Sequence, residues 1–286
     1  MVGRKTERVD TMKKMTVAVA QTYCSEDMQK NYVRAEEMVA EAARKGARLI
    51  VFPEVMNYVG KPDPASFEPV PDGEACRRMA AAAKKHGIWV NLGSIREETG
   101  DKPYNTSVLF SPEGEVKGIY RKLHLCDMQA APDKPVIRES DKMRSGDEIV
   151  VVDTEEFKIG MSICYDLRFP ELFRLMSEKG AQIICHPSCF SVTTGSAHWE
   201  VLLRSIAILN HCYVLASNHC GSQYDGKPMW GHSMIIDPWG TVIAEAGQER
   251  ETLLVADIDL DYCEELKGRL GCMTNRRTDV YSLREL

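Results

Sequence analysis

The stretch RKGARLIVFPE at residues 44–54 returns in altered form as EKGAQIICHPS at residues 178–188. Each copy has a basic residue before Gly-Ala, then an apolar run, and then proline followed by a polar side chain. A short apolar run bounded by turn residues is typical of a strand that is buried on both faces. The repetition therefore predicts a fold built from two similar halves.

Strand-type and helix-type segments alternate around both copies. In the first half, the strand 16–21 precedes a helical pattern that ends at Gly46, and the alanine-rich helix 75–87 precedes the strand 88–94. The second half has the same rhythm, with strands expected at 157–164, 181–188 and 212–218 and helices at 170–180 and 198–211. This βα alternation predicts an α/β fold with parallel strands.

Two further segments interrupt the alternation. VLFSPEGEVKGIYRK (108–122) and HSMIIDPWGTVIAEAG (232–247) each contain two strand-like runs joined by a turn with proline and glycine, which is the pattern of a hairpin. A strand at 252–259 and a final helical stretch at 261–270 follow. The sheets are therefore expected to be mixed, either with helices on both faces of each sheet or with two sheets packed together and helices outside.

Composition restricts the class of protein. The 286 residues are 44% hydrophobic and 27% charged without a linker-like shift, which predicts one domain over residues 15–286. Residues 1–14 are polar, lack a secretory signal and are expected to be a flexible N-terminal extension, so a cytoplasmic location is predicted. No apolar run reaches the roughly 20 residues that cross a bilayer. Lys and Arg are scattered in a chain of net charge -6, which disfavours nucleic-acid binding.

The ten cysteines are expected to be reduced thiols, mostly used as small buried side chains. No CxxC pair occurs. The nearest pattern to a metal site is His211-Cys212 followed by His219-Cys220, but the YVLASN between the two pairs is typical of a buried strand. We therefore expect no metal.

The segment IGMSICYDLRFPE (159–171) places Cys164 between an apolar strand and a helix that starts near Pro170. Such a turn exposes a side chain, directs backbone N–H groups at a bound molecule and lowers a thiol pKa through the helix start. The sequence position alone leaves two readings open. Cys164 is a nucleophile, or it is a buried core cysteine like the other nine.

A nucleophilic thiol needs a proton acceptor and a group that stabilises an oxyanion. Glu54 follows the strand of RLIVFPE, at the strand end where α/β sheets carry their ligand chemistry. Lys122 ends a strand between apolar residues in IYRKLHL. Taken singly, the carboxylate is more typical of a solvated loop, and the lysine is more typical of an ordinary surface.

Three motifs in order resemble those of the nitrilase (carbon–nitrogen hydrolase) superfamily: FPE (52–54), YRKLHL (120–125) and CYDLRFPE (164–171). The likeness extends from about residue 15 through TTGSAHWE (193–200) and GHSMIIDPWGTV (231–242). It favours the amidase branch that contains omega-amidase and deaminated glutathione amidase. The resemblance implies one carbon–nitrogen hydrolase domain over residues 15–286.

The resemblance also implies a four-layer α-β-β-α sandwich with mixed sheets and internal pseudo-two-fold symmetry. It implies a homodimer or a higher homo-oligomer, and neither a metal nor an organic cofactor. A small linear carboxamide bearing a carboxylate, such as deaminated glutathione or an α-keto ω-amide, would be cut to the acid and ammonia.

The resemblance assigns roles to individual residues. Glu54 takes the thiol proton, Cys164 attacks the amide carbon to form a thioester, and Lys122 with the backbone N–H of Tyr165 stabilises the oxyanion. Glu54 then protonates the leaving group and activates water. Glu139 in VIRESD matches a second family glutamate. Lys122 between two glutamates would offset their effect on the thiol and allow a thiolate–ammonium pair.

Substrate contacts are implied at four further positions. Arg168 and Thr194 match residues that bind a substrate carboxylate, as a guanidinium can do with two parallel hydrogen bonds. The alternative for Arg168 is an internal ion pair with Asp166 or Glu171. His198 and Trp199 line the pocket, or they cap and pack the following helix.

Other functions stay open at this point. Hydrolysis of a nitrile or of an N-carbamoyl amine would use the same Glu, Lys and Cys. A Cys-His dyad could use His124, His186 or His232, although none of them stands in a signature beside Cys164. From a different class, the chain could be a non-catalytic scaffold or a thiol sensor, which its many cysteines suggest.

Overall fold

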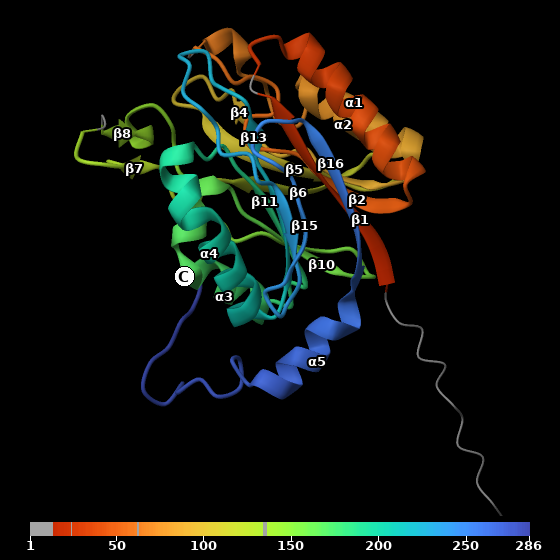
Figure 1. Ribbon diagram of the computed structural model, residues 1–286, viewed down its shortest axis with the longest axis vertical. Coiled ribbons are helices and arrows are strands. Elements are labelled where there is room, and N and C mark those ends of the chain that lie inside the picture. The colour runs from red at the N-terminus through yellow and green to blue at the C-terminus, as the bar shows by residue number, and fades with distance from the viewer. Residues whose placement is uncertain (1–13, 24, 62, 134–135) are drawn as a thin grey trace, which may run out of the picture.

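The computed structural model describes residues 14–286 except residues 24, 62, 134 and 135. Two large sheets and a small hairpin are joined by helices (Figure 1). The α-helices of the described part are α1 (Met28–Arg44), α2 (Glu74–His86), α3 (Pro170–Glu178), α4 (Val192–Asn210) and α5 (Leu260–Leu270).

The first sheet has eight strands, with the order β13-β1-β2-β3-β5-β4, and with β16 paired to β1 and β6 paired to β5. Strands β1, β2 and β3 are parallel, whereas β4, β5, β6 and β16 run antiparallel to their partners. The bounds are β1 (Lys14–Tyr23), β2 (Ala47–Val51), β3 (Trp89–Asn91), β4 (Ile95–Glu97), β5 (Tyr104–Phe110), β6 (Val116–Arg121), β13 (His219–Cys220) and β16 (Thr252–Asp259).

The second sheet has six strands in the order β15-β14-β12-β11-β10-β9. Strands β10, β11 and β12 are parallel, and β9, β14 and β15 are antiparallel. Both sheets are mixed, as predicted. The bounds are β9 (Val151–Asp153), β10 (Lys158–Met161), β11 (Ile183–Pro187), β12 (Tyr213–Ser217), β14 (Met234–Ile236) and β15 (Val242–Glu245).

The two halves repeat one order of elements, which confirms the predicted pseudo-symmetry. The last strand of β1-α1-β2-α2-β3 pairs with the antiparallel β5, and the last strand of β10-α3-β11-α4-β12 pairs with the antiparallel β14. The two copies of the repeated sequence form β2 and β11, which therefore hold equivalent places. Their ends meet, because the Glu54 N–H donates to the Ser188 carbonyl oxygen at 3.3 Å.

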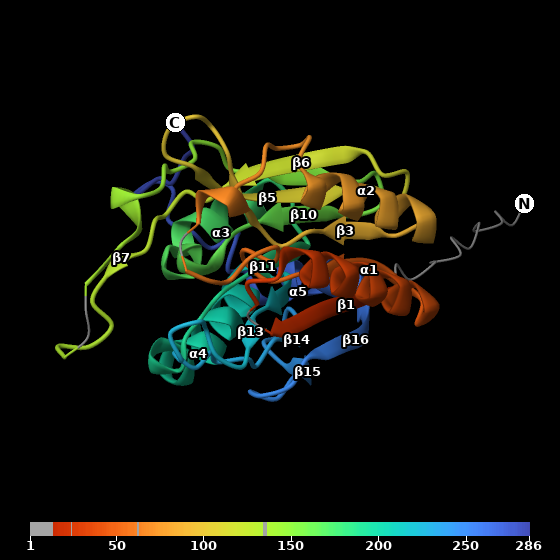
Figure 2. The same ribbon diagram turned by 90° about the horizontal axis from the view of Figure 1, so that it is seen from above.

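Alternation along the strands explains the four layers. In β1, Val17 and Val19 belong to the apolar cluster between the two sheets, whereas Ala18 and Ala20 belong to the cluster under α1 and α2. A third cluster joins the outer face of the second sheet to α3 and α4. Figures 1 and 2 accordingly show α1 and α2 on one side of the paired sheets and α3 and α4 on the other. The predicted α-β-β-α sandwich is confirmed.

Several element boundaries differ from the sequence prediction, and two of them concern the N-terminus and the site. β1 already begins at Lys14, so residue 14 is part of a strand; the rest of the expected extension, residues 1–13, lies outside the described residues. α4 begins at Val192, six residues before the expected start, because Gly195 packs so closely on Trp230 that a Cβ would lie 2.2 Å from the indole. Tertiary packing there overrides the low helix propensity of Thr and Gly.

A further difference is a hairpin within the loosely patterned stretch after Lys122, formed by β7 (Asp127–Met128) and β8 (Ile137–Arg138). Two residues per strand are too few for an alternation to be visible in the sequence.

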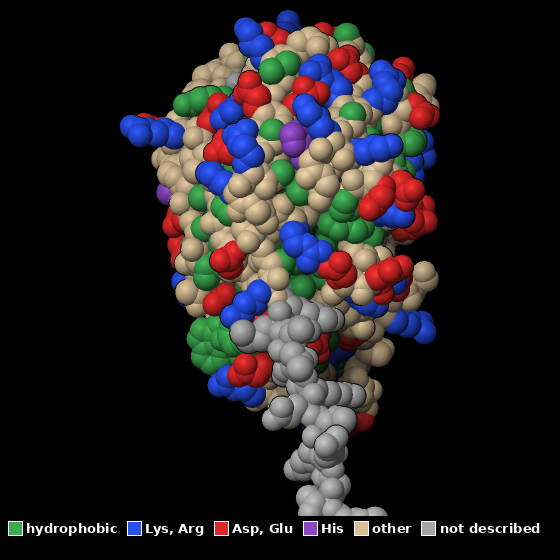
Figure 3. Space-filling model, turned by 90° about the vertical axis from the view of Figure 1, so that its right-hand side faces the viewer, with side chains coloured by type: hydrophobic (Ala, Val, Ile, Leu, Met, Phe, Trp, Pro, Cys, Tyr) green, Lys and Arg blue, Asp and Glu red, His purple; other side chains and the backbone are tan. Residues whose placement is uncertain are grey.

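Surface features fit the composition. None of the helices within the described ranges is long and apolar enough to cross a membrane. On the face drawn in Figure 3, basic and acidic side chains are interspersed.

Candidate active site

Cys164 sits at a strained turn between β10 and α3. β10 ends at Met161, a short 3-10 helix spans Cys164–Arg168, and α3 starts at Pro170. The φ of Cys164 is 47°, in the left-handed region that residues other than glycine rarely adopt. Strain of this kind is concentrated at functional sites, because the surrounding structure must hold it in place. The turn therefore presents a partly exposed thiol at the end of the parallel strands.

Lys122 joins two carboxylates beside this thiol. Its Nζ lies 3.0 Å from Glu54 Oε1 and 3.0 Å from Glu139 Oε2, and only 2% of the lysine side chain is exposed. The Cys164 thiol hydrogen bonds to the Glu54 carboxylate. The structure thus brings together the four side chains that the sequence motifs singled out, from segments 110 residues apart.

Two residues that sequence reasoning missed fix Glu54 and Lys122. Asn105 on β5 donates from Nδ2 to Glu54 Oε1 at 2.8 Å, and its carbonyl oxygen accepts from the Lys122 N–H at 2.9 Å. His219 Nε2 donates to the Glu54 carbonyl oxygen at 2.7 Å. The signal for Asn105 was an asparagine inside an apolar strand, where asparagine is depleted.

Glu139 reaches Lys122 because the β7–β8 hairpin folds the chain back toward the end of β6. It opens a short 3-10 helix directly after β8, and its Oε2 accepts from the Cys126 N–H at 2.6 Å. Its side chain is 17% exposed, more than the 7% of Glu54. Of the two carboxylates, Glu54 is thus the more enclosed and the one bonded to the thiol.

Burial and charge set the protonation states of the group. Burial opposes the charged forms of both Glu54 and Lys122, yet their mutual attraction prevails, so the pKa of Glu54 is lowered and the pKa of Lys122 is raised well above its usual range. Burial and the Glu54 charge raise the pKa of the Cys164 thiol well above its ordinary value, despite the opposing effect of Lys122.

The raised thiol pKa disfavours the expected thiolate–ammonium pair in the resting protein. It favours a neutral thiol beside a carboxylate and an ammonium, because a second anion next to Glu54 in a buried place is disfavoured. A thiol that is poised beside a carboxylate base needs proton transfer before or during attack.

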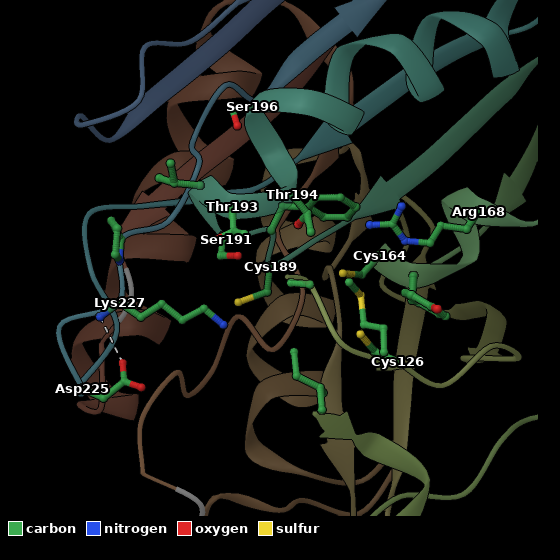
Figure 4. A pocket seen from close by; sticks show the side chains of 17 residues that line it. Cys126, Cys164, Arg168, Cys189, Ser191, Thr193, Thr194, Ser196, Asp225 and Lys227 are labelled. Carbon is green, nitrogen blue, oxygen red and sulfur yellow. Dashed lines mark hydrogen bonds between the residues drawn. The ribbon is translucent and has the colours of Figure 1, made fainter. Parts of the chain in front are cut away.

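A cavity of about 560 Å³ opens over Cys164 (Figure 4). Arg168, Thr194 and the Tyr165 side chain line it, as the sequence reasoning expected for the first two. Glu54 and Lys122 lie behind the thiol rather than in the cavity lining. Its size is typical of sites that enclose a whole small molecule, roughly 300–1,000 Å³.

The Arg168 guanidinium has no carboxylate partner among the described residues. It lies over the Tyr165 ring at 5.4 Å and contacts His198 Nδ1 at 3.3 Å, and its Nε is buried without a hydrogen bond. Asp166, one of the two partners considered for an ion pair, instead accepts hydrogen bonds from other groups. The unpartnered Nε leaves capacity for a bound anion.

Trp199 packs its helix, which is the second of its two alternatives, whereas His198 fits neither alternative. Trp199 is fully buried against Phe190, and its Nε1 donates to the His232 carbonyl oxygen at 2.6 Å, so it packs α4 and cannot touch a ligand. His198 is exposed and contacts Arg168 from outside the cavity lining. The expectation that these two residues line the pocket is therefore wrong.

Lys227 is a pocket residue that the sequence did not reveal. Figure 4 shows its side chain extending across the cavity toward Cys189 and Cys164, on the side opposite Arg168. Its N–H donates to Asp225 Oδ1 at 3.1 Å, and the neighbouring Pro228 carbonyl oxygen accepts from the Val192 N–H at 3.2 Å. The loop that carries Lys227 is thus fixed to the cavity wall.

The histidines considered for a Cys-His dyad are engaged elsewhere. His124 Nδ1 lies 2.7 Å from Asp166, and His232 Nδ1 lies 2.6 Å from Glu245. His186 is buried on Ser162, and burial lowers its pKa to about 4. None of the three replaces Glu54 as the partner of the thiol.

A sandwich of this kind with Glu, Lys and Cys at one place defines a carbon–nitrogen hydrolase. The family model described as carbon–nitrogen hydrolase matches residues 16–268, and the chain belongs to this family. It is a hydrolase that acts on carbon–nitrogen bonds other than peptide bonds.

Relatives and solved structures agree with this assignment. The chain is 41% identical to an omega-amidase of Xenopus tropicalis, over 96% of this chain and 99% of that one. It is 39% identical to the deaminated glutathione amidase of Homo sapiens, over 93% of this chain and 83% of that one. Among solved structures, the C. elegans NitFhit protein has a TM-score of 0.86 at 34% identity, over 94% of this chain and 66% of that longer one.

A mutant of the amidase from Nesterenkonia sp. AN1 has a TM-score of 0.75 at 26% identity, with 93% of this chain and 98% of that one covered. In that protein acrylamide has added to the active site cysteine.

The electrostatics of the site predict opposite effects of two substitutions on the Cys164 thiol. Lys122→Met is expected to shift the pH profile of alkylation by iodoacetamide to higher pH, because Lys122 lowers the thiol pKa; Glu54→Gln is expected to shift it to lower pH, because Glu54 raises that pKa. The measurement is the alkylation rate of the Cys164 peptide by mass spectrometry across pH. The exposed Lys117→Met serves as the control. Shifts in one common direction would contradict the assignment.

Proposed function

We propose that the protein hydrolyses a small carboxylate-bearing amide through a thioester on Cys164. The observation that carries the proposal is the hydrogen bond between the Cys164 thiol and Glu54, held beside the buried Lys122 ammonium. Glu54 accepts the thiol proton as the sulfur attacks the carbonyl carbon. The oxyanion that forms is stabilised by Lys122 and by the backbone N–H of Tyr165.

Glu54 acts twice in this sequence. After attack it carries the proton that the departing amine needs, and it then takes a proton from water so that hydroxide attacks the thioester. The enclosed carboxylate suits both steps, because the hydrogen bond from Lys122 to its Oε1 holds it in place beside the thiol. Glu139 holds the second side of the ammonium and keeps it protonated. No metal or organic cofactor takes part in the proposed steps.

The cavity supports an anionic substrate. Two cations, Arg168 and Lys227, line it on opposite sides of Cys164 against one carboxylate, that of Asp225, although the chain as a whole has a net charge of -6 (Figure 4). The Thr194 side chain also lines it and can add a hydroxyl donor to a carboxylate held by Arg168. We therefore favour an α-keto ω-amide or a deaminated glutathione-like amide; two of the relatives are named as an omega-amidase and a deaminated glutathione amidase.

Two functions compete with amide hydrolysis. A nitrile or an N-carbamoyl amine would meet the same thiol, carboxylate and ammonium, and the names of the relatives favour the amide. A thiol sensor would need a low thiol pKa, because the thiolate is the form that oxidants attack. The raised pKa of Cys164 argues against that role.

The first prediction of the proposal concerns Cys164. Cys164→Ala is expected to lower kcat on an α-keto ω-amide by at least about a thousandfold, because removal of a nucleophile leaves only binding and oxyanion stabilisation. Ammonia release measures it. In the unmodified protein quenched during turnover, mass spectrometry is expected to find the acyl group on Cys164.

Cys189→Ala is the matched control, since this cysteine lines the same cavity and is expected to leave kcat nearly unchanged. Full ammonia release by Cys164→Ala would refute the nucleophile. Turnover of nitriles alone in a panel of amides, nitriles and carbamoyl amines would refute the amide.

The second prediction concerns substrate charge. Arg168→Gln is expected to lower kcat/KM for a carboxylate-bearing amide roughly 10- to 100-fold, as for a lost hydrogen bond to a charged group. Lys227→Met is expected to lower it about two- to fivefold, because an exposed ion pair contributes less. Steady-state kinetics with an uncharged amide of equal length is the comparison. Equal losses on both amides would show that neither residue recognises the carboxylate.

We also propose a homodimer, as the resemblance implies. The outer face of α4 and the adjoining β14–β15 turn expose large apolar side chains: Val201 is 63% exposed and Trp239 is 50% exposed. The two elements are in contact, because Arg204 Nε donates to the Gly240 carbonyl oxygen at 2.7 Å. Exposed apolar side chains that gather on one face are typical of interaction sites.

The dimer predicts that Val201→Glu shifts the protein from dimer to monomer in sedimentation velocity, because it places a charge in an apolar interface. The matched control is Val33→Glu on α1, where the valine is 47% exposed. A wild-type protein that sediments as a monomer at micromolar concentration would refute this interface and the dimer together.

The remaining expectations from the sequence are part of the same proposal. One domain over residues 15–286 is supported by apolar clusters that join elements from both halves of the chain. A cytoplasmic location is supported by the nine cysteines of the described part, all of which are free thiols.

A further inference from the structure

The Asp166 carboxylate is fully buried and accepts four hydrogen bonds. Oδ2 accepts from the Ile163 N–H at 2.8 Å and from the Tyr120 hydroxyl at 2.7 Å. Oδ1 accepts from the His124 N–H at 3.1 Å and lies 2.7 Å from His124 Nδ1. A buried carboxylate is tolerated only with such partners, so its geometry is closely determined.

These four donors come from two segments that meet at the active site, residues 120–124 and Ile163. Ile163 directly precedes Cys164, and its carbonyl oxygen accepts from the Asp166 N–H at 3.0 Å, so the carboxylate also closes the strained turn of the nucleophile. Tyr120 and His124 lie two residues before and two residues after Lys122. One carboxylate therefore links the backbone around the thiol to the backbone around the ammonium.

Further contacts stiffen the same link. The Tyr120 hydroxyl accepts from the Leu123 N–H at 3.3 Å, which fixes the peptide that follows Lys122. The His124 ring stacks on Phe169 at 3.7 Å between centroids, and the Phe169 N–H donates to the Asp166 carbonyl oxygen at 2.9 Å. The segment after β6 is thus attached to both the start and the end of the turn that begins with Cys164.

We infer that Asp166 is a positioning residue, whose carboxylate fixes the Lys122 ammonium relative to the Cys164 sulfur by joining the segment 120–124 to the nucleophile turn. Oxyanion stabilisation depends on this separation, and a displacement of about 1 Å can cost a hundredfold in rate. The inference rests on the proposed function, because the kcat that it affects is that of amide hydrolysis. The geometry that it describes is present in the protein without substrate.

The first test replaces Asp166 by asparagine, which is similar in shape but cannot accept from all four donors. Asp166→Asn is expected to lower kcat on an α-keto ω-amide about 10- to 100-fold with KM changed less than about twofold. The alkylation profile of Cys164 with iodoacetamide is expected to shift to higher pH, because the ammonium that favours the thiolate is no longer held beside it. Loss of the Asp166 charge alone would shift that profile to lower pH.

A second variant covers the case in which Asp166→Asn does not fold. Tyr120→Phe removes one donor from the segment 120–124 and keeps the carboxylate charge, and it is expected to lower kcat roughly three- to tenfold and to shift the alkylation profile in the same direction. The control is Glu68→Gln, another buried carboxylate with several donors, which bonds to Asn57 and to the Ala75 N–H. It is expected to lower the melting temperature and to leave kcat and the profile unchanged.

The outcomes separate the two proposals. Lower melting temperatures for Asp166→Asn and Tyr120→Phe, with wild-type kcat and profile, would reduce Asp166 to a structural residue and overturn the inference. A shift of the profile to lower pH would overturn it as well. If the wild-type protein cleaved no amide, the proposed function would fail, while the alkylation profiles would still decide the role of Asp166.

Discussion

The buried pair of Lys122 and Glu54 is the interaction on which the rest of the site depends. An ammonium that is 2% exposed has lost its water and is stable only if carboxylates replace it. Glu54 and Glu139 supply two, and Asn105 and the Cys164 thiol complete the hydrogen bonds of Glu54. In the proposed function the pair also decides the chemistry, because the carboxylate serves as the base and the ammonium stabilises the oxyanion that forms on the carbonyl.

The double sandwich creates the place where this pair can exist. Glu54 follows β2 and Cys164 follows β10, and these strands belong to different sheets whose inner faces share one apolar cluster. The ends of the two sheets therefore converge, with Glu54 bonded to Ser188 at the equivalent point of the other half. An arrangement with pseudo-symmetry thus yields an asymmetric site, because Glu54 in one copy corresponds to Ser188 in the other.

The electrostatics favour a neutral Cys164 thiol in the resting protein, because its pKa is raised. A neutral thiol is a poorer target for oxidants than a thiolate, which matters because this thiol is partly exposed; in the proposed function the thiolate forms when Glu54 takes the proton. Arg168 and Lys227, against the one carboxylate of Asp225, leave the cavity lining with an excess of positive charge, while the ammonium behind the thiol is paired with two glutamates. The proposed function therefore assigns attraction of an anionic substrate and stabilisation of the oxyanion to different cations.

The sequence by itself determined the alternation of strands and helices, the duplication, and the motifs that hold Glu54, Lys122, Glu139 and Cys164, because these are local patterns of period, turn chemistry and residue type. Tertiary structure alone decided what those residues touch. The Trp199 side chain lies in the core, the Lys227 side chain extends into the cavity, and the pKa of the Cys164 thiol is raised. Each of these depends on burial and charge, which are set by neighbours far away in the chain. Asn105, Asp166 and His219 act on the site only through such distant contacts, which no local pattern records.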